Sequence, residues 1–282
     1  MRYLIPLSLL ALSCTASVNA EQSASTKQWF NTINYAKIDS RYYSDNVYGL
    51  STHYYFEEQQ SSGVWDDYGY LDTDSNIGLN YFNSDGFSRK GIFGEGFYGN
   101  AFATIELPNI GDTDTYSLGI GYLFADSLKV SARMVDYEYG DTVYLFKAQY
   151  NHQINDTDYI GFTVETDDEI ESWDLSSRYF AHLYDERYFT INADYLDAGD
   201  DSIFNVLANY YFNKHVAVGV GLYDSDLVVE GKYFINDNYY FTANYTDNDD
   251  YDIYNLSFSK YKKAALLESL QLNKAAFILK QL

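Results

Sequence analysis

The stretch HVAVGVGLYDSDLVVEGKYFINDNYYFTANYTDND, from His215 to Asp249, alternates two kinds of side chain. In its first half the two sets are Val216, Val218, Val220, Leu222 and Ala217, Gly219, Gly221, Tyr223. After Asp224-Ser225-Asp226 they are Leu227, Val229, Gly231, Tyr233, Ile235 and Val228, Glu230, Lys232, Phe234. Successive side chains of a strand point to opposite faces of its sheet, so the pattern predicts a hairpin with one apolar and one mixed face. In a soluble protein the apolar face is buried, whereas in a membrane barrel it faces lipid.

The length of the alternating runs favours the membrane. After Thr115 the chain repeats a run of alternating residues followed by a few turn residues. We expect strands at Tyr116–Phe124, Leu128–Tyr137, Val143–Gln153, Tyr159–Thr166, Trp173–Leu183, Tyr188–Leu196, Ile203–Phe212, Val216–Tyr223, Leu227–Ile235, Tyr239–Thr246 and Ile253–Tyr261. Strands of about 9–11 residues are needed to cross a bilayer at a tilt, whereas strands in soluble proteins usually have about five or six.

The pattern is looser before Thr115. Strands are expected near Trp29–Ile38, Val47–Phe56, Ile77–Phe82, Ile92–Tyr98 and Ala101–Leu107. Together with the later runs, these ranges predict an all-β antiparallel meander that closes into a transmembrane barrel. About 16 strands are expected, with 14 or 12 as alternatives. Glu57–Ser75 is the one long connection, and on its length we expect it to fold at or into the pore.

The first 20 residues have the features of a secretory signal. Arg2 supplies a positive charge, Leu4–Leu12 is apolar, and Val18-Asn19-Ala20 resembles a small-residue cleavage site. Cys14, the only cysteine, lies inside this segment, where the preceding Ala-Leu-Ser fits a lipid-anchor pattern poorly. The expected domains are therefore a signal peptide at 1–20, a barrel at 21–261 and a tail at 262–282.

Composition restricts the class of partner. The net charge of −23 at pH 7 would repel a nucleic-acid backbone. Such acidity is common in disordered chains, but 32 tyrosines and 19% aromatic residues argue for a folded protein. Two prolines in 282 residues fit long uninterrupted strands.

Two kinds of connection alternate along the predicted barrel. One set is short: 125–127, 155–156, 185–186, 213–214 and 236–237. The other is more acidic: 167–171, 197–201 and 247–252. Bacterial barrels have short periplasmic turns and larger outer loops, so we expect the acidic set outside the cell, beside lipopolysaccharide. Acidic turns can also serve only to keep a protein soluble, but their regular alternation favours the topological interpretation.

Aromatic residues gather at strand ends, which is typical of the girdles at the two membrane interfaces. Plain β-propensity of tyrosine is the alternative explanation. The clusters are Tyr122/Phe124, Tyr179/Phe180, Tyr210/Tyr211/Phe212, Tyr233/Phe234 and Tyr239/Tyr240/Phe241.

The face opposite the apolar one carries charge, and we expect it to line a water-filled lumen. A charged side chain facing lipid in mid-strand costs about 2–4 kcal/mol for Arg or Lys, which favours inward placement. Any one of these residues is more simply explained by pairing or packing than by filtering solutes. The candidate pore-lining residues are Lys129, Arg133, Lys147, Glu165, Arg178, His182, Asp194, Glu230 and Lys232.

A resemblance adds to this interpretation. The stretch VYGLSTHYYFEEQQSSGVWDDYGYLDTDSNIGLNYF (Val47 to Phe82) contains Tyr48-Gly49-Leu50-Ser51, Tyr54-Tyr55-Phe56 and an aromatic insert that begins at Gly63. It resembles the N-terminal region of the general bacterial porin family of marine gamma-proteobacteria. The resemblance implies an outer-membrane β-barrel porin that passes ions and small hydrophilic solutes, expected to be a homo-oligomer such as a trimer. It implies no catalytic residue, metal or cofactor.

The C-terminal end departs from that family. Such barrels usually end on an aromatic residue, whereas this chain continues as KKAALLESLQLNKAAFILKQL (Lys262 to Leu282). The tail is predicted to be an amphipathic helix. Its four lysines and one glutamate exclude a membrane span.

Three other functions compete with a diffusion channel. A barrel hydrolase would need a nucleophile beside a histidine, but the four histidines (His53, His152, His182 and His215) are scattered without such a context. A calcium-binding secreted protein is suggested by the acidic loops, yet Asp247–Asp250 lacks the glycine and final glutamate of an EF-hand loop. A non-conducting adhesin or structural barrel is the main alternative, although its loops would be expected to be longer.

Overall fold

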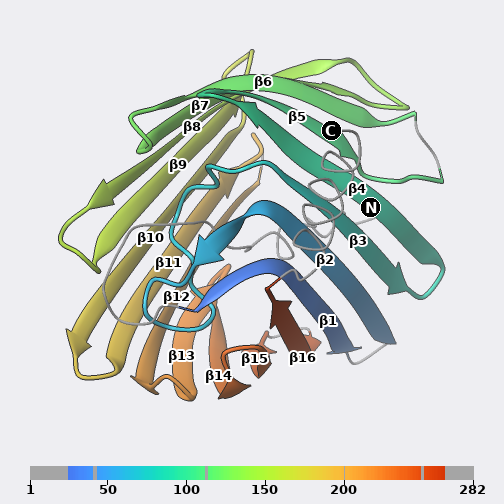
Figure 1. Cartoon of the computed structure of the whole chain (residues 1–282). Coiled ribbons are helices and arrows are strands. Elements are labelled where there is room, and N and C mark those ends of the chain that lie inside the picture. The colour runs from blue at the N-terminus through green and yellow to red at the C-terminus, as the bar shows by residue number, and fades with distance from the viewer. Residues whose placement is uncertain (1–24, 41–42, 112–113, 200, 249–250, 264–282) are drawn as a thin grey trace, which may run out of the picture.

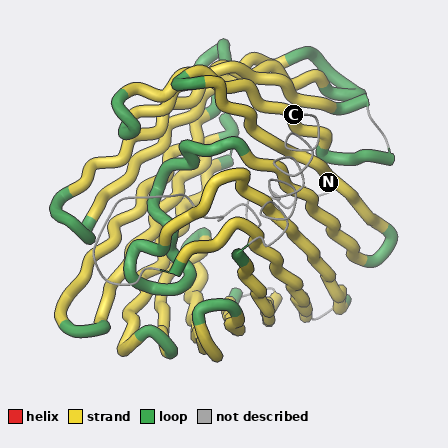
Figure 2. The backbone as a smooth tube through the Cα atoms, in the orientation of Figure 1, coloured by secondary structure: helices red, strands yellow, loops and turns green. Residues whose placement is uncertain are grey.

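The computed structural model describes residues 25–40, 43–111, 114–199, 201–248 and 251–263. They form one antiparallel barrel, drawn in Figures 1 and 2, and no helix among them is long and apolar enough to cross a membrane. The strands are β1 (Thr26–Ser40), β2 (Ser44–Gln60), β3 (Asn76–Ser84), β4 (Phe87–Tyr98), β5 (Ala101–Leu107), β6 (Tyr116–Phe124), β7 (Leu128–Asp136), β8 (Val143–Gln153), β9 (Tyr159–Asp167), β10 (Trp173–Tyr184), β11 (Arg187–Asp197), β12 (Ser202–Asn213), β13 (Val216–Tyr223), β14 (Asp226–Asn236), β15 (Tyr239–Asp247) and β16 (Tyr251–Lys262).

Each strand pairs with its neighbours in sequence, and β1 pairs with β16 to close the sheet. Closure leaves no unpaired strand edge, which is the requirement for a sheet surrounded by lipid. The predicted all-β meander barrel is thus confirmed, with 16 strands rather than 14 or 12. Asp224 and Ser225, at the centre of the opening hairpin, both have positive φ (47° and 78°), as a tight two-residue hairpin turn requires.

The first four strands are longer than the sequence pattern predicts. β2 continues to Gln60, four residues past its predicted end, and β4 begins at Phe87 rather than Ile92. Ser88, Arg89 and Lys90 are polar and interrupt the alternation, so the start of β4 is not visible in the pattern. The long connection is consequently confined to residues 61–75.

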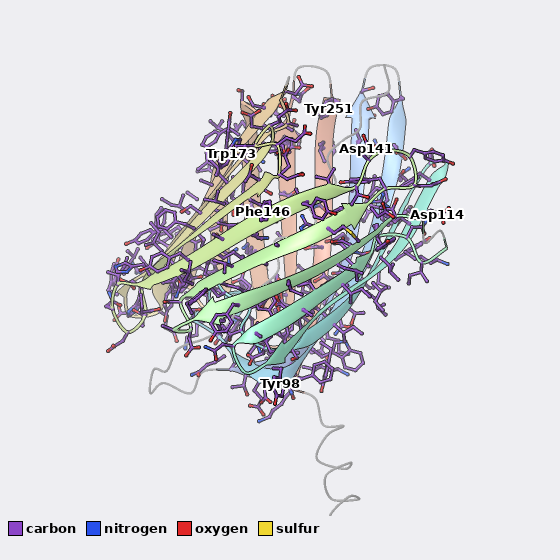
Figure 3. The ribbon with its side chains drawn as sticks, turned by 90° about the horizontal axis from the view of Figure 1, so that it is seen from above. Tyr98, Asp114, Asp141, Phe146, Trp173 and Tyr251 are labelled. Carbon is purple, nitrogen blue, oxygen red and sulfur yellow. The ribbon has the colours of Figure 1, made fainter. Side chains whose placement is uncertain are left out.

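The two ends of the barrel differ. At one end, which we call the turn end, β1 begins, β16 finishes, and all connections except 61–75 have two to five residues. The opposite end, which we call the loop end, carries the predicted acidic connections. Figure 3 shows Tyr98 at the turn end, with Asp114, Asp141 and Tyr251 toward the loop end. The predicted signal peptide and tail lie outside the described residues, apart from Lys262 and Lys263.

Candidate functional site in the barrel lumen

The strand registers assign every side chain to the outer or the inner face. In the opening hairpin Val218 and Val220 are 46% and 56% exposed on the outer face, whereas Ala217 is buried on the inner one. Glu230 and Lys232 share the inner face with Ala217, because they pair across the strands with Gly219 and Ala217. The predicted orientation of this hairpin, with valines toward lipid, matches the structure.

The aromatic clusters divide between the two faces, which corrects the prediction that all of them form lipid girdles. In the four clusters with adjacent aromatic residues the neighbours alternate between the faces; Tyr233, for example, is exposed outside, whereas Phe234 is fully buried inside. Alternation of side chains makes this unavoidable for adjacent aromatic residues. Tyr122 and Phe124 are two positions apart, and both are exposed on the outer face. The inner set forms an aromatic collar at the turn end: Phe30, Tyr55, Tyr159, Phe180, Tyr188, Tyr211, Phe234, Tyr240 and Tyr261.

Residues 61–75, which we call the lumen segment, pack against this collar. Val64, Tyr68 and Leu71 are at most 2% exposed, although they belong to a connection between strands. The Tyr68 ring lies 4.9 Å from that of Phe30, and the Trp65 ring lies 4.9 Å from that of His215. The lumen segment leaves the sheet between β2 and β3 and reaches strands half-way round the barrel (Figure 1).

Asp66 anchors the lumen segment to β12 and β14. Its carboxylate accepts a hydrogen bond from the Tyr211 hydroxyl at 3.1 Å and lies 2.9 Å from Lys232 Nζ. Lys232 also lies 3.5 Å from Glu230 Oε1. Asp66 and Lys232 are 7% and 16% exposed, so solvent screens this ion pair little.

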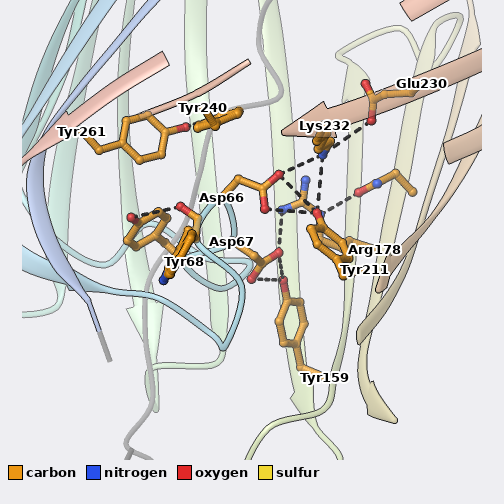
Figure 4. A network of polar contacts seen from close by, with 12 residues as sticks. Asp66, Asp67, Tyr68, Tyr159, Arg178, Tyr211, Glu230, Lys232, Tyr240 and Tyr261 are labelled. Atoms are coloured by element: carbon orange, nitrogen blue, oxygen red, sulfur yellow. Dashed lines mark hydrogen bonds and ion pairs between the residues drawn. The ribbon is translucent and has the colours of Figure 1, made fainter. Parts of the chain in front are cut away.

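Asp67 makes a second, equally buried anchor to β9 and β10 (Figure 4). The Tyr159 hydroxyl donates to its carboxylate at 2.8 Å, and Arg178 Nη1 lies 3.3 Å from the same oxygen. Arg178 is oriented in turn by a 2.6 Å hydrogen bond from its Nε to Asn192 Oδ1. Removing one partner of a buried ion pair costs about 3–5 kcal/mol, so the two anchors are strong restraints on the lumen segment.

Two glycines provide the space that docking requires. A Cβ on Gly63, whose φ is +139°, would lie 2.6 Å from the Tyr188 ring, so another residue there would be both strained and blocked. A Cβ on Gly161 of β9 would lie 2.1 Å from the ring of Tyr70. Tyr70 thus lies flat on the inner wall, where its hydroxyl is 2.7 Å from Thr163 Oγ1.

Asp72 joins the lumen segment to the other side of the wall. The Tyr55 hydroxyl donates to its carboxylate at 2.8 Å, and Lys129 Nζ of β7 donates to its main-chain carbonyl at 2.9 Å. Lys129 is also ion-paired with Glu95 at 2.6 Å. Burial raises the pKa of Asp72 to about 6, despite the opposing effect of the Lys129 charge.

The nine predicted pore-lining residues all lie on the inner face, in two groups of four, with His182 apart from both. Lys129, Arg178 and Lys232 are bonded to the lumen segment, and Glu230 lies beside Lys232. Arg133, Lys147, Glu165 and Asp194 lie nearer the loop end, and His182 lies by the turn at Asp185, whose carbonyl is 2.7 Å from its Nε2.

The charges nearer the loop end are more accessible. Arg133 Nη2 lies 2.6 Å from Glu165 Oε1, and Lys147 Nζ lies 3.9 Å from Glu165 Oε2. The side chains of Arg133 and Lys147 are 30% and 36% exposed, about twice the values for Arg178 and Lys232. On the strands beside them, Asp174 and Asp194 extend the same inner wall.

The sequence pattern did not identify Asp66 and Asp67 as partners of the inner cations. One signal was available. The register places no carboxylate directly opposite Arg178 or Lys232, whose cross-strand neighbours are glycine, asparagine, alanine and threonine. A buried cation needs a counter-charge. The only long connection, with its Asp66-Asp67 pair, was the available source.

The lumen is therefore lined by a polar wall with charges of both signs, and the lumen segment is docked against that wall. In the described ranges no group of three or more His, Cys, Asp or Glu residues could hold a metal ion. Fixed charges of both signs along such a wall select among ions and small solutes by their charge and size.

Comparison with known proteins agrees with this geometry. A family model described as "Putative general bacterial porin" matches residues 1–274. No curated protein sequence matches the chain.

Solved structures with the same fold include the Acinetobacter baumannii outer membrane protein Omp33 (12% identity, TM-score 0.55, covering 84% of this chain and 98% of that one). A mutant of the Rh. blastica porin is also similar, at 9% identity and a TM-score of 0.50, with 84% of this chain and 99% of that one covered. The low-pH structure of Pseudomonas putida OprB is similar at 10% identity and a TM-score of 0.51, with 84% of this chain and 91% of that one covered.

Proposed function

The chain belongs to the family described as putative general bacterial porin, and from that starting point we propose how its channel selects solutes. The protein is an outer-membrane porin, a channel for passive diffusion of small solutes. In our proposal the lumen segment sets the narrowest part of this channel, and the wall nearer the loop end makes it prefer cations. Eight charged residues among the nine inner-face residues supply the charge of this wall, and His182 is a polar part of it.

The position of the lumen segment supports the first part of the proposal. It extends from the β2–β3 side of the barrel to β9, β10, β12 and β14. It therefore occupies part of the cross-section of the lumen, which would be filled with water in a barrel without this segment. A barrel of 16 strands is otherwise wide enough for an aqueous channel. The docked segment would therefore reduce the conductance of the channel.

The balance of charge supports the second part. Arg133 and Lys147 each lie within 4.0 Å of a glutamate, so their charges are largely compensated. Among the described residues, no cation lies within that distance of Asp174 or Asp194. These two carboxylates, which form no ion pair within 4.0 Å with any described residue, would raise the local concentration of cations together with the acidic loops beside them.

A planar-bilayer recording tests the channel and its charge preference. The folded protein should give ohmic conductance steps, and a KCl gradient should produce a reversal potential of the sign for cation preference. A reversal potential at zero or of anion sign would exclude the charge assignment.

The second candidate is a barrel with no conductance, such as a structural protein or an adhesin. The docked lumen segment is the observation that favours it, because a fully blocked lumen would pass nothing. Membrane-inserted wild-type protein without conductance steps would support this candidate over the channel.

Membrane orientation and assembly are also part of the proposal. The turn end would face the periplasm and the acidic loop end the lipopolysaccharide leaflet, following the usual topology of such barrels. A homo-oligomer, with a trimer as the expected form, is checked by the mass of the detergent-extracted protein. No catalytic activity is needed for any of these roles.

A further inference from the structure

A hollow of about 570 Å³ lies on the outer surface, where β1 and β13–β16 form the wall. Its lining is almost entirely apolar and includes Val218, Gly231, Tyr233, Phe241, Ala243 and Leu256. These side chains belong to the face that the barrel presents to lipid. The hollow is therefore separate from the lumen.

Two small residues create the hollow. Gly231 and Ala243 are direct cross-strand partners, and larger side chains, Tyr233 and Phe241, form the next outer row. A Cβ placed on Gly231 would find no heavy atom within 4 Å. The floor is thus bare backbone under open space, bordered by rings that are 57% (Tyr233) and 47% (Phe241) exposed.

A cation lies on the same face, toward the turn end. Lys260 is four residues beyond Leu256 on β16, about 13 Å along a strand. Its Nζ lies 5.3 Å from the centre of the Tyr239 ring. No carboxylate of the described chain lies within 4.0 Å of Lys260, and Lys262 follows on the same face.

A row of rings connects the cation with the hollow. The ring of Tyr239 is stacked on Phe258 at 6.0 Å, and Phe258 lies 4.9 Å from Phe241, which borders the hollow. At the loop end of the same strands, Asp247 and Asp252 are direct cross-strand neighbours on the outer face, so two negative charges lie side by side there. An anionic group is therefore favoured only at the Lys260 end.

We propose that this surface binds one glycerophospholipid of the periplasmic leaflet, with its phosphate beside Lys260 and one acyl chain in the hollow over Gly231 and Ala243. The distance from cation to hollow is shorter than an extended acyl chain, so one molecule reaches both. The chain gains dispersion contacts with the backbone floor and the rings. The lysine attracts the phosphate, with about 1 kcal/mol per basic residue near an anionic surface.

Native mass spectrometry of the barrel, extracted in mild detergent from vesicles of phosphatidylethanolamine and phosphatidylglycerol, tests the proposal. The wild-type protein should retain one phospholipid. Gly231→Leu should lose it, because the new side chain fills the hollow without a clash. Gly96→Leu is the matched control, since Gly96 also lies on the outer face with no atom within 4 Å of its would-be Cβ, and it should retain the lipid.

Lys260→Gln provides a second variant that leaves the hollow intact. It should reduce retention of phosphatidylglycerol about fivefold, the factor that corresponds to about 1 kcal/mol. Heat-modifiable mobility on a gel shows that each variant is a closed barrel. Three results would overturn the proposal. The first is a wild-type protein without bound lipid, and the second is equal lipid retention by the wild type and Gly231→Leu. The third is a wild-type dimer without bound lipid that Gly231→Leu converts to a monomer, because the hollow would then be an interface between two copies of the chain.

Discussion

The lumen near the turn end and the lumen near the loop end are built from the same strands but use charge differently. At the level of the lumen segment, Arg178 and Lys232 are bonded to its aspartates and are 16–17% exposed. Nearer the loop end, Arg133 and Lys147 share Glu165 within the wall and are 30–36% exposed. The same residue types thus hold a segment in place at one level and face solvent at the other. Substitutions at the two levels should therefore have different effects.

The largest effect is expected from reversing both anchors. In Arg178→Glu/Lys232→Glu, each aspartate of the lumen segment would face a like charge. Breaking a buried pair costs about 3–5 kcal/mol, which is more than a hundredfold in an equilibrium constant. The segment should leave its docked position, and single-channel conductance should increase.

The matched control is Arg133→Glu/Lys147→Glu, which changes charge by the same amount at the accessible level. It should strengthen cation preference and leave conductance in symmetric concentrated salt near the wild-type value. Equal increases in conductance for the two double variants would contradict the distinction between the two levels.

A smaller effect is expected from occupying the space under Tyr70. In Gly161→Val the added side chain collides with the Tyr70 ring. Inserting carbon atoms into a packed site typically costs about 1–3 kcal/mol, so docking should weaken without being abolished. Recordings should show more frequent transitions to a higher conductance level. Gly219→Ala would be a poor control for this variant. Its new Cβ would collide with Asn209, which belongs to the barrel wall and not to the lumen segment, so the substitution would disturb the wall itself.

Neutralising Asp174 and Asp194 should change selectivity rather than conductance. The variant Asp174→Asn/Asp194→Asn removes the two carboxylates that no cation of the described wall compensates within 4.0 Å. The reversal potential in a KCl gradient should move toward zero. An unchanged value would mean that the cation preference arises elsewhere, for example in the acidic loops.

The smallest effect is expected from pH. Because burial raises the pKa of Asp72 to about 6, above the ordinary carboxyl value of 3.8, docking of the lumen segment takes up a proton. This contribution to docking is complete below pH 3.8 and is lost as pH rises through about 6. Channel opening should therefore become less frequent as the pH falls from 7 to 5. In Asp72→Asn, which mimics the protonated form, opening should lose this dependence.

The alternation of residues was enough to predict the barrel and the orientation of its strands. Val218 and Lys232 were assigned to the correct faces because strand periodicity is a local property. The inner aromatic collar was not predicted, since Phe180 and Phe234 are adjacent in sequence to aromatic residues that do face lipid. The inner aromatic residues differ from their outer neighbours only in that they pack against one another and against the lumen segment.

The docked position of residues 61–75 depends on contacts between distant parts of the chain. Asp66 and Lys232 are 166 positions apart, and Asp67 and Arg178 are 111 positions apart. The length of the connection suggested that it enters the pore. Its exact partners could not be identified, because a single sequence shows no direct relation between residues so far apart.

The most direct test of the central claim is the single-channel conductance of a barrel whose residues 62–74 are replaced by a flexible linker of about eight Gly and Ser residues, enough to span the gap. A variant with the same kind of replacement at 137–142, a loop-end connection, is the control. If the lumen segment narrows the channel, the first variant should conduct more than wild type and the second should not. Equal conductance for wild type and the 62–74 replacement, with both barrels closed and inserted, would contradict the account.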